Sequence, residues 1–112
     1  MDVQDACELI AEFTRGMDGA AYAANALVRS AVERQLGIIG EALSQLSKLD
    51  PALAGRVPDC RQIIAFRHVV IHGSAVLDHQ RVWTEVDASL PGLAAAARLL
   101  LAELNLLADS NP

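Results

Sequence analysis

The chain has 112 residues, of which 53% are hydrophobic and 4% aromatic. This length suits a single domain over residues 1–112, and the abundance of Ala and Leu with few β-branched runs favours helices over sheet. A net charge of −5 argues against a general nucleic-acid binder, and no apolar run reaches the roughly 18 residues that a membrane helix needs.

The first half of the chain is predicted to form two helices. The first covers about residues 3–17 and ends at Asp18-Gly19. The second is long, covers about residues 21–48 and ends at Asp50-Pro51. Apolar residues recur along it at intervals of three and four, which is the helical period. These residues are Val28, Val32, Leu36, Ile39, Leu43 and Leu46.

Two glycines interrupt the interior of this second helix. Gly37 and Gly40 each cost about 1 kcal/mol relative to Ala, so we expect another helix to approach closely at both. Glu41 lies on the opposite side from the apolar stripe. It is either a plain solvent-exposed residue or part of a second, polar contact surface.

The second half of the chain is predicted to hold two or three more helices. One covers about residues 59–73, with Asp59 as its N-cap and Gly73 as its C-terminal residue of positive φ. Asp78 is the N-cap of the next, Pro91 marks a break or kink, and a last helix runs to about residue 107. The fold class is therefore an all-α, up-down antiparallel bundle of four or five helices.

Charge and candidate chemistry are concentrated in residues 56–81. This segment has a local balance of +2 against −7 for the remainder, and it holds all three histidines, His68, His72 and His79. The two cysteines, Cys7 and Cys60, are interpreted as small buried free thiols of a cytoplasmic protein. The mean hydropathy of +0.28 is high for a soluble domain of this size and indicates an oligomer interface.

The run AFRHVVIHGSA, residues 65–75, places an arginine in an apolar surrounding. On a helical wheel Arg67 falls about 40° from Ile63, inside the apolar arc of its helix. An arginine in that position must snorkel to water, pair with a carboxylate or line a polar cavity.

The two histidines of this run lie four residues apart. His68 and His72 could form half of a metal site, which His79, Cys60 or a carboxylate would have to complete. They could instead serve acid–base chemistry, with Arg67 stabilising an anion, or be ordinary surface histidines. The missing second ligand pair disfavours a metal, and we expect none.

At this point the sequence resembles a known family. Residues 67–72 fit the Arg-x4-His motif of the HEPN superfamily of helical ribonucleases and nucleotide-binding modules. The order of AVERQLGIIGEAL, a Pro-containing loop and IIAFRHVVIHGSAVLDHQRVWTEVDASLPGL is similar to the HepT toxin family over residues 28–101.

The resemblance implies a HEPN-type bundle acting as a metal-independent endoribonuclease toxin without a cofactor. It implies a homodimer, an RNA substrate and an MntA-like nucleotidyltransferase antitoxin as partner, in the cytoplasm, with no membrane or DNA partner. Arg67 and His72 would be catalytic in a dimer cleft, where a 2′-hydroxyl attacks the neighbouring phosphate. His68 would be auxiliary, and Glu41 is a candidate partner of Arg67.

One departure from the family keeps alternatives open. The family motif ends His-x-Tyr, and its tyrosine receives AMP from the antitoxin, whereas this chain has Ser74. Ser74 is then the modified residue, or the antitoxin acts by binding alone, or the activity has decayed. The alternative function is a non-catalytic HEPN module that binds a nucleotidyltransferase or its nucleotide substrate, and a helical dimerisation domain without a site is a third.

Overall fold

The computed structural model describes residues 2–72 and 79–110, and the side chains of residues 3–67 and 79–103. This part of the chain contains helices and no strand, so the predicted all-α class is confirmed. It has six helices rather than four or five, because two short ones were not foreseen. The helices are α1 (Asp2–Phe13), α2 (Gly19–Ala24), α3 (Ala26–Leu49), α4 (Pro51–Ala54), α5 (Cys60–His72) and α6 (His79–Ser110).

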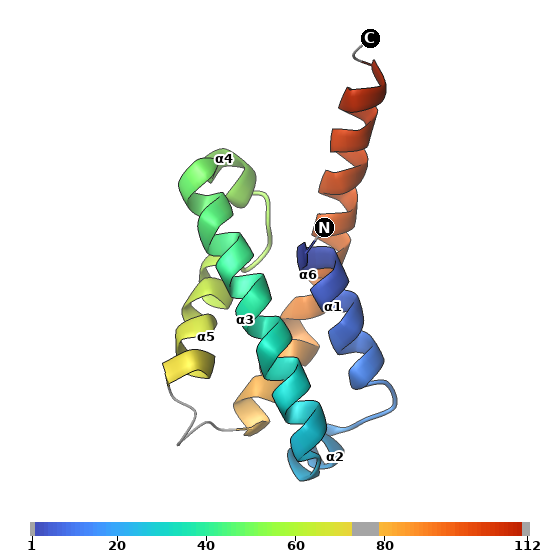
Figure 1. Ribbon diagram of the computed structural model, residues 1–112, viewed down its shortest axis with the longest axis vertical. Helices are drawn as coiled ribbons and strands as arrows, with labels where there is room; N and C mark the ends of the chain where they lie inside the picture. Colours follow the sequence, from blue (N-terminus) through green and yellow to red (C-terminus); the bar gives the residue numbers. More distant parts are fainter. Residues whose placement is uncertain (1, 73–78, 111–112) are drawn as a thin grey trace.

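Helix α3 is the central element of the bundle. It packs against α1 and α5, and α6 packs against α1 and α2. In Figure 1, α1 and α5 run in the opposite direction to α3, which gives the expected up-down arrangement, and the C-terminal part of α6 extends beyond the other helices.

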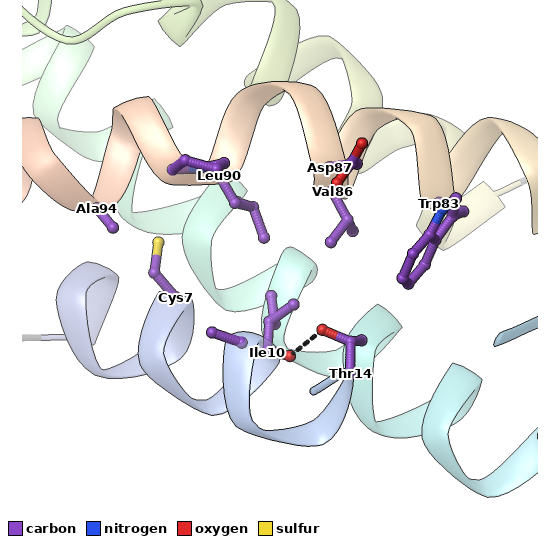
Figure 2. A pocket seen from close by; sticks show the side chains of 10 residues that line it. Cys7, Ile10, Thr14, Trp83, Val86, Asp87, Leu90 and Ala94 are labelled. Carbon is purple, nitrogen blue, oxygen red and sulfur yellow. Dashed lines mark hydrogen bonds between the residues drawn. The ribbon is translucent and has the colours of Figure 1, made fainter. Parts of the chain in front are cut away.

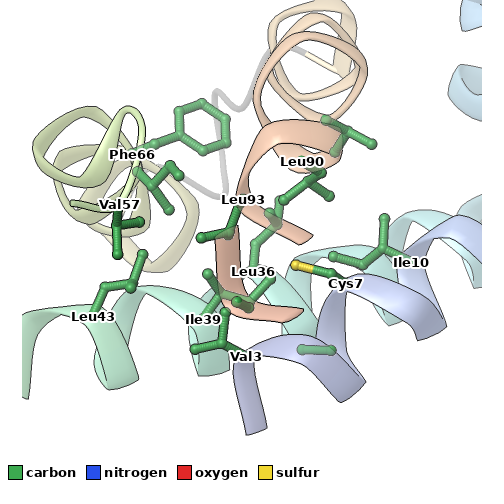
Figure 3. Packing of buried hydrophobic residues seen from close by; sticks show 14 of the residues in the cluster. Val3, Cys7, Ile10, Leu36, Ile39, Leu43, Val57, Phe66, Leu90 and Leu93 are labelled. Atoms are coloured by element: carbon green, nitrogen blue, oxygen red, sulfur yellow. The ribbon is translucent and has the colours of Figure 1, made fainter. Parts of the chain in front are cut away.

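The predicted apolar stripe of α3 forms the middle of the core. Its central residues are buried, and Val28 and Leu46 at its ends are partly buried against them. Figure 3 shows Leu36, Ile39 and Leu43 between side chains of α1 and α6 and those of the α5 region. Branched and straight aliphatic side chains fill this core almost alone, which is what the low aromatic content predicts.

Asn25 divides the long helix that the sequence predicts over residues 21–48, so that prediction is wrong. Its backbone N–H donates to the Tyr22 carbonyl at 3.2 Å and ends α2. Its side-chain oxygen accepts from the Val28 N–H at 3.0 Å and begins α3. Asp18 likewise begins α2, accepting from the Ala21 N–H at 2.8 Å. α1 ends at Phe13, four residues before the predicted end.

Of the break or kink expected at Pro91, the break does not occur, because α6 continues through this residue. The proline lacks one backbone N–H, but its ring is exposed while Leu90 and Leu93 on either side are buried. Packing on both sides of the proline therefore holds the helix together. Asp59 precedes α5 as predicted, its carbonyl accepting from the Ile63 N–H at 2.9 Å with φ at 58°. Gly73 and Asp78 lie outside the described residues.

Candidate functional site

The side chain of Arg67 extends from α5 and crosses the backbone of α3 at Gly40. A Cβ built on Gly40 would fall 2.5 Å from the Cβ of Arg67, 2.6 Å from its Cδ and 2.9 Å from its Cγ. No real side chain tolerates such distances, so the bare backbone at Gly40 is what admits the arginine stem. The close approach predicted for Gly40 is confirmed. For Gly37 the prediction is wrong, because no atom of the described residues lies within 4 Å of a Cβ built there.

The guanidinium of Arg67 pairs with a carboxylate one residue further along α3. Arg67 Nη2 lies 2.8 Å from Glu41 Oε2, with 26% of the arginine side chain and 49% of the glutamate side chain exposed. Gln45, one turn later, donates from Nε2 to Glu41 Oε1 at 3.0 Å. Of the three outcomes that the helical wheel allowed for Arg67, the structure has the carboxylate.

One donor of this arginine has no partner. Arg67 Nε is buried and makes no hydrogen bond among the described residues. Its neighbours on α5, Ile63 and Phe66, are buried in the core, so the arginine lies beside apolar core residues, as its place inside the apolar arc predicts. The site thus combines one carboxylate with a fixed guanidinium that solvent still reaches in part.

The remaining predicted site residues fall at the end of α5 and after it. α5 ends at His72, but the side chains of His68 and His72 lie outside the described part, and so does Ser74. His79 begins α6, and its Nδ1 is buried and has no hydrogen-bond partner among the described residues. No three His, Cys, Asp or Glu side chains gather as a metal site among the described residues, which leave out His68 and His72.

Two arginines in residues 56–81 pair with carboxylates of α3 and α6. Arg67 pairs with Glu41, and Arg56 Nη2 lies 2.8 Å from Glu103 Oε2. The hydrogen bond that Arg56 donates to Glu103 raises the Arg56 pKa. Arg81 lies over the Phe66 ring, 5.9 Å from its centroid. The count of charges in the sequence could not reveal these pairs.

A pocket between α1 and α6 was not predicted from the sequence. Its volume is about 370 Å³, and Figure 2 shows Cys7, Ile10 and Thr14 facing Trp83 and Leu90 across it. The Thr14 hydroxyl donates to the Ile10 carbonyl at 2.8 Å. Burial, with a smaller contribution from Glu8, raises the Cys7 pKa to about 11. The thiol is therefore neutral and a poor nucleophile near neutral pH.

Both cysteines are free and buried, as predicted, and burial also raises the pKa of Cys60. None of the helices in the described part is both long and apolar enough to cross a membrane.

The only tyrosine of the chain is a core residue. Tyr22 is fully buried, its ring centroid lies 5.4 Å from that of Trp83, and its hydroxyl has no partner among the described residues. Burial and the nearby Glu33, partly offset by Arg29, raise its pKa to about 12. The phenol is therefore neither reachable nor ionised in the folded protein, and it cannot replace the tyrosine that the HepT motif has two residues after its histidine.

Comparison with known proteins gives the family of this chain. The sequence model of the HepT-like family, described as ribonuclease HepT-like, matches residues 3–100. The Methanocaldococcus jannaschii protein named "Putative RNase MJ1380" is 28% identical over 90 residues, 80% of this chain and 82% of that protein. The "Probable ribonuclease HepT" of Thermococcus cleftensis is 32% identical over 92 residues, 82% of this chain and 83% of that protein. No solved structure matches.

Proposed function

Because this chain belongs to the ribonuclease HepT-like family, we propose that it is a metal-independent endoribonuclease with Arg67 and His72 as catalytic residues. One observation carries the proposal. The guanidinium of Arg67 is held beside α3 by Gly40 and Glu41 yet remains partly exposed, on the same helix as His72. A fixed, reachable cation suits the binding of a phosphodiester.

The reaction follows from the chemistry of these two side chains. The 2′-hydroxyl of a ribose attacks the adjacent phosphorus while a base takes its proton, the bond to the next 5′-oxygen breaks, and that oxygen is protonated. The products are a 2′,3′-cyclic phosphate and a 5′-hydroxyl. A histidine can take or give a proton near neutral pH, and Arg67 would stabilise the negative charge of the phosphorane. No step requires a metal ion.

A second copy of the chain would complete the cleft. Arg67 and His72 are five residues apart on one helix, which separates them by about 140° around the axis and about 7.5 Å along it. One straight helix therefore directs them at one phosphate poorly, whereas two copies facing each other could combine them.

The further roles follow the family pattern. His68 would assist next to Arg67, and an MntA-like nucleotidyltransferase would act as the antitoxin of this cytoplasmic toxin. Because Tyr22 is buried, adenylylation would fall on Ser74, or the antitoxin would act by binding alone.

The alternative is a non-catalytic HEPN module that binds a nucleotidyltransferase or its nucleotide. The pairing of Arg67 with Glu41 favours this alternative, because a neutralised arginine attracts phosphate less strongly.

The test is incubation of the purified protein with total RNA in the presence of EDTA, beside the His72→Ala variant. We expect the natural protein to cleave RNA to products with 2′,3′-cyclic phosphate ends, and the variant to leave it intact. Cleavage that persists unchanged in His72→Ala would contradict the catalytic role. Absence of cleavage with both proteins would favour the binding module.

A further inference from the structure

The path of the Arg67 stem is set by a residue that has no side chain. Three carbons of Arg67 lie within 3 Å of the place where a Gly40 Cβ would be. The stem therefore runs along the bare backbone of α3, and Gly37, three residues earlier, has no such neighbour. Gly40 is thus specific to Arg67 rather than a general requirement of helix packing.

The guanidinium of the same side chain is bound by the Glu41 carboxylate, which Gln45 binds in turn. Glu41 Oε2 lies 2.8 Å from Arg67 Nη2, and Glu41 Oε1 accepts from Gln45 Nε2 at 3.0 Å. Gln45 restrains the rotation of the Glu41 carboxylate, and the carboxylate restrains the guanidinium. Two adjacent residues of α3 therefore position Arg67: Gly40 makes room for the aliphatic stem, and Glu41 binds the guanidinium.

This arrangement leaves one edge of the guanidinium for a ligand. A guanidinium can bind a phosphate in a bidentate way through Nε and Nη2 or through its two Nη groups. Nε is buried, and Nη2 lies 2.8 Å from Glu41 Oε2. Nη1 takes no part in this pair, so a phosphate would bind at the end of the guanidinium that carries Nη1.

We propose that Glu41 is a positioning residue which, with Gly40, holds the guanidinium of Arg67 with its Nη1 end toward the scissile phosphate. The inference rests on the proposed function. Glu41 acts through Arg67 and does not touch the RNA. The opposite role, in which Glu41 masks Arg67 and repels the phosphate, predicts faster cleavage once the carboxylate is removed.

The kinetic test compares Glu41→Ala, Glu41→Gln, Arg67→Ala and the double variant Glu41→Ala/Arg67→Ala on a short RNA. We expect Glu41→Ala to lower kcat by roughly tenfold to a hundredfold, as a displaced catalytic group does. Glu41→Gln, which keeps an acceptor oxygen, should recover part of that loss. The double variant should be no slower than Arg67→Ala. Additive losses, or a faster Glu41→Ala enzyme, would overturn the proposal.

Two glycine variants supply a matched comparison on the same helix. Gly40→Ala forces the Arg67 stem aside and should lower kcat as Glu41→Ala does. Gly37→Ala adds the same methyl group in open space and should leave kcat unchanged. Equal effects of the two glycine variants would contradict the specific role of Gly40, and Glu41→Ala tests the proposal independently if Gly40→Ala does not fold.

A third measurement does not depend on RNA cleavage. In ¹⁵N NMR spectra, the buried Nε–H of Arg67 should exchange slowly with solvent in the natural protein and faster in Glu41→Ala, while the backbone amides of α3 stay unchanged. If no RNA is cleaved but this difference is found, the proposed function fails and the positioning by Glu41 stands. Identical exchange rates would overturn the positioning itself.

Discussion

On the α5 side of α3, Arg67 lies partly buried and pairs with Glu41. On the side of α1, α2 and α6, Cys7 and Tyr22 are buried more deeply, and neither has a charged partner within bonding distance among the described residues. Cys7 lines an apolar pocket there, and the Tyr22 hydroxyl makes no hydrogen bond among the described residues. Burial raises the pKa of both groups and keeps them neutral.

The difference shows that burial alone does not make a side chain reactive. A buried group without a partner adopts its neutral form, because the charged form is disfavoured in a medium of low polarity. The guanidinium of Arg67, by contrast, is always charged, and the Glu41 carboxylate and partial exposure to solvent offset the cost of burying it. We therefore expect substitutions on the α5 side to change activity, and those on the opposite side to change stability.

The largest expected effect is the loss of cleavage in Arg67→Ala. Removal of a group that stabilises transition-state charge costs on the order of a hundredfold to a thousandfold in kcat. Arg61→Ala is the matched control, because it removes the same charge from an exposed position on the same helix. The measurement is the initial rate of cleavage of a short RNA, with circular dichroism as the check of folding. Equal losses in the two variants would remove Arg67 from the site.

On the opposite side, Ile10→Ala should destabilise the fold while activity per folded molecule stays the same. Ile10 is fully buried, and truncation of such a side chain costs about 2–5 kcal/mol of unfolding free energy. Leu9→Ala on the same helix is the control, because Leu9 is exposed. Urea unfolding followed by circular dichroism measures both. A similar loss in the two variants would show that α1 is packed differently.

An intermediate effect is expected from alkaline pH. The Tyr22 pKa rises from an ordinary value of 10.0 to about 12 in the folded protein. Between these values the unfolded chain releases the phenol proton and the folded chain retains it, so the free energy of unfolding falls as pH rises. The loss is on the order of 2 kcal/mol.

Tyr22→Phe isolates this contribution. Thermal unfolding of the variant should depend less on pH above 10 than that of the natural protein. Near pH 7 its stability should be unchanged or slightly higher, since the lost hydroxyl has no partner among the described residues. An equally steep alkaline loss in both proteins would show that Tyr22 does not cause it.

The sequence predicted the main helices because the three-and-four spacing of apolar residues in α3 is a local signal. It missed the boundary at Asn25, where the same side chain and its backbone cap two helices inside an Ala-rich run that otherwise favours continuation. It offered a break or a kink at Pro91. That α6 continues there could not be predicted, because the packing of Leu90 and Leu93 on both sides of the proline is a property of the folded bundle.

The site was predictable to a similar degree. The position of Arg67 in an apolar arc already limited it to water, a carboxylate partner or a polar cavity, and Glu41 could be named as a candidate partner. The distinction between Gly37 and Gly40 could not be made, because it depends on where α5 crosses α3. The pocket between α1 and α6 has no sequence signal, since it is lined mostly by ordinary apolar residues from two segments that lie far apart in the sequence.

The smallest effect is expected from the second arginine–glutamate pair of the chain. Arg56 Nη2 lies 2.9 Å from Glu103 Oε1 and 2.8 Å from its Oε2, but 51% and 44% of the two side chains are exposed. Water and salt screen such a pair, so Arg56→Ala should leave the midpoint of thermal unfolding unchanged within error. Cleavage should also be unchanged, in contrast to Arg67→Ala. A clear fall in the midpoint that high salt abolishes would show that this pair fastens α6 to the segment after α4.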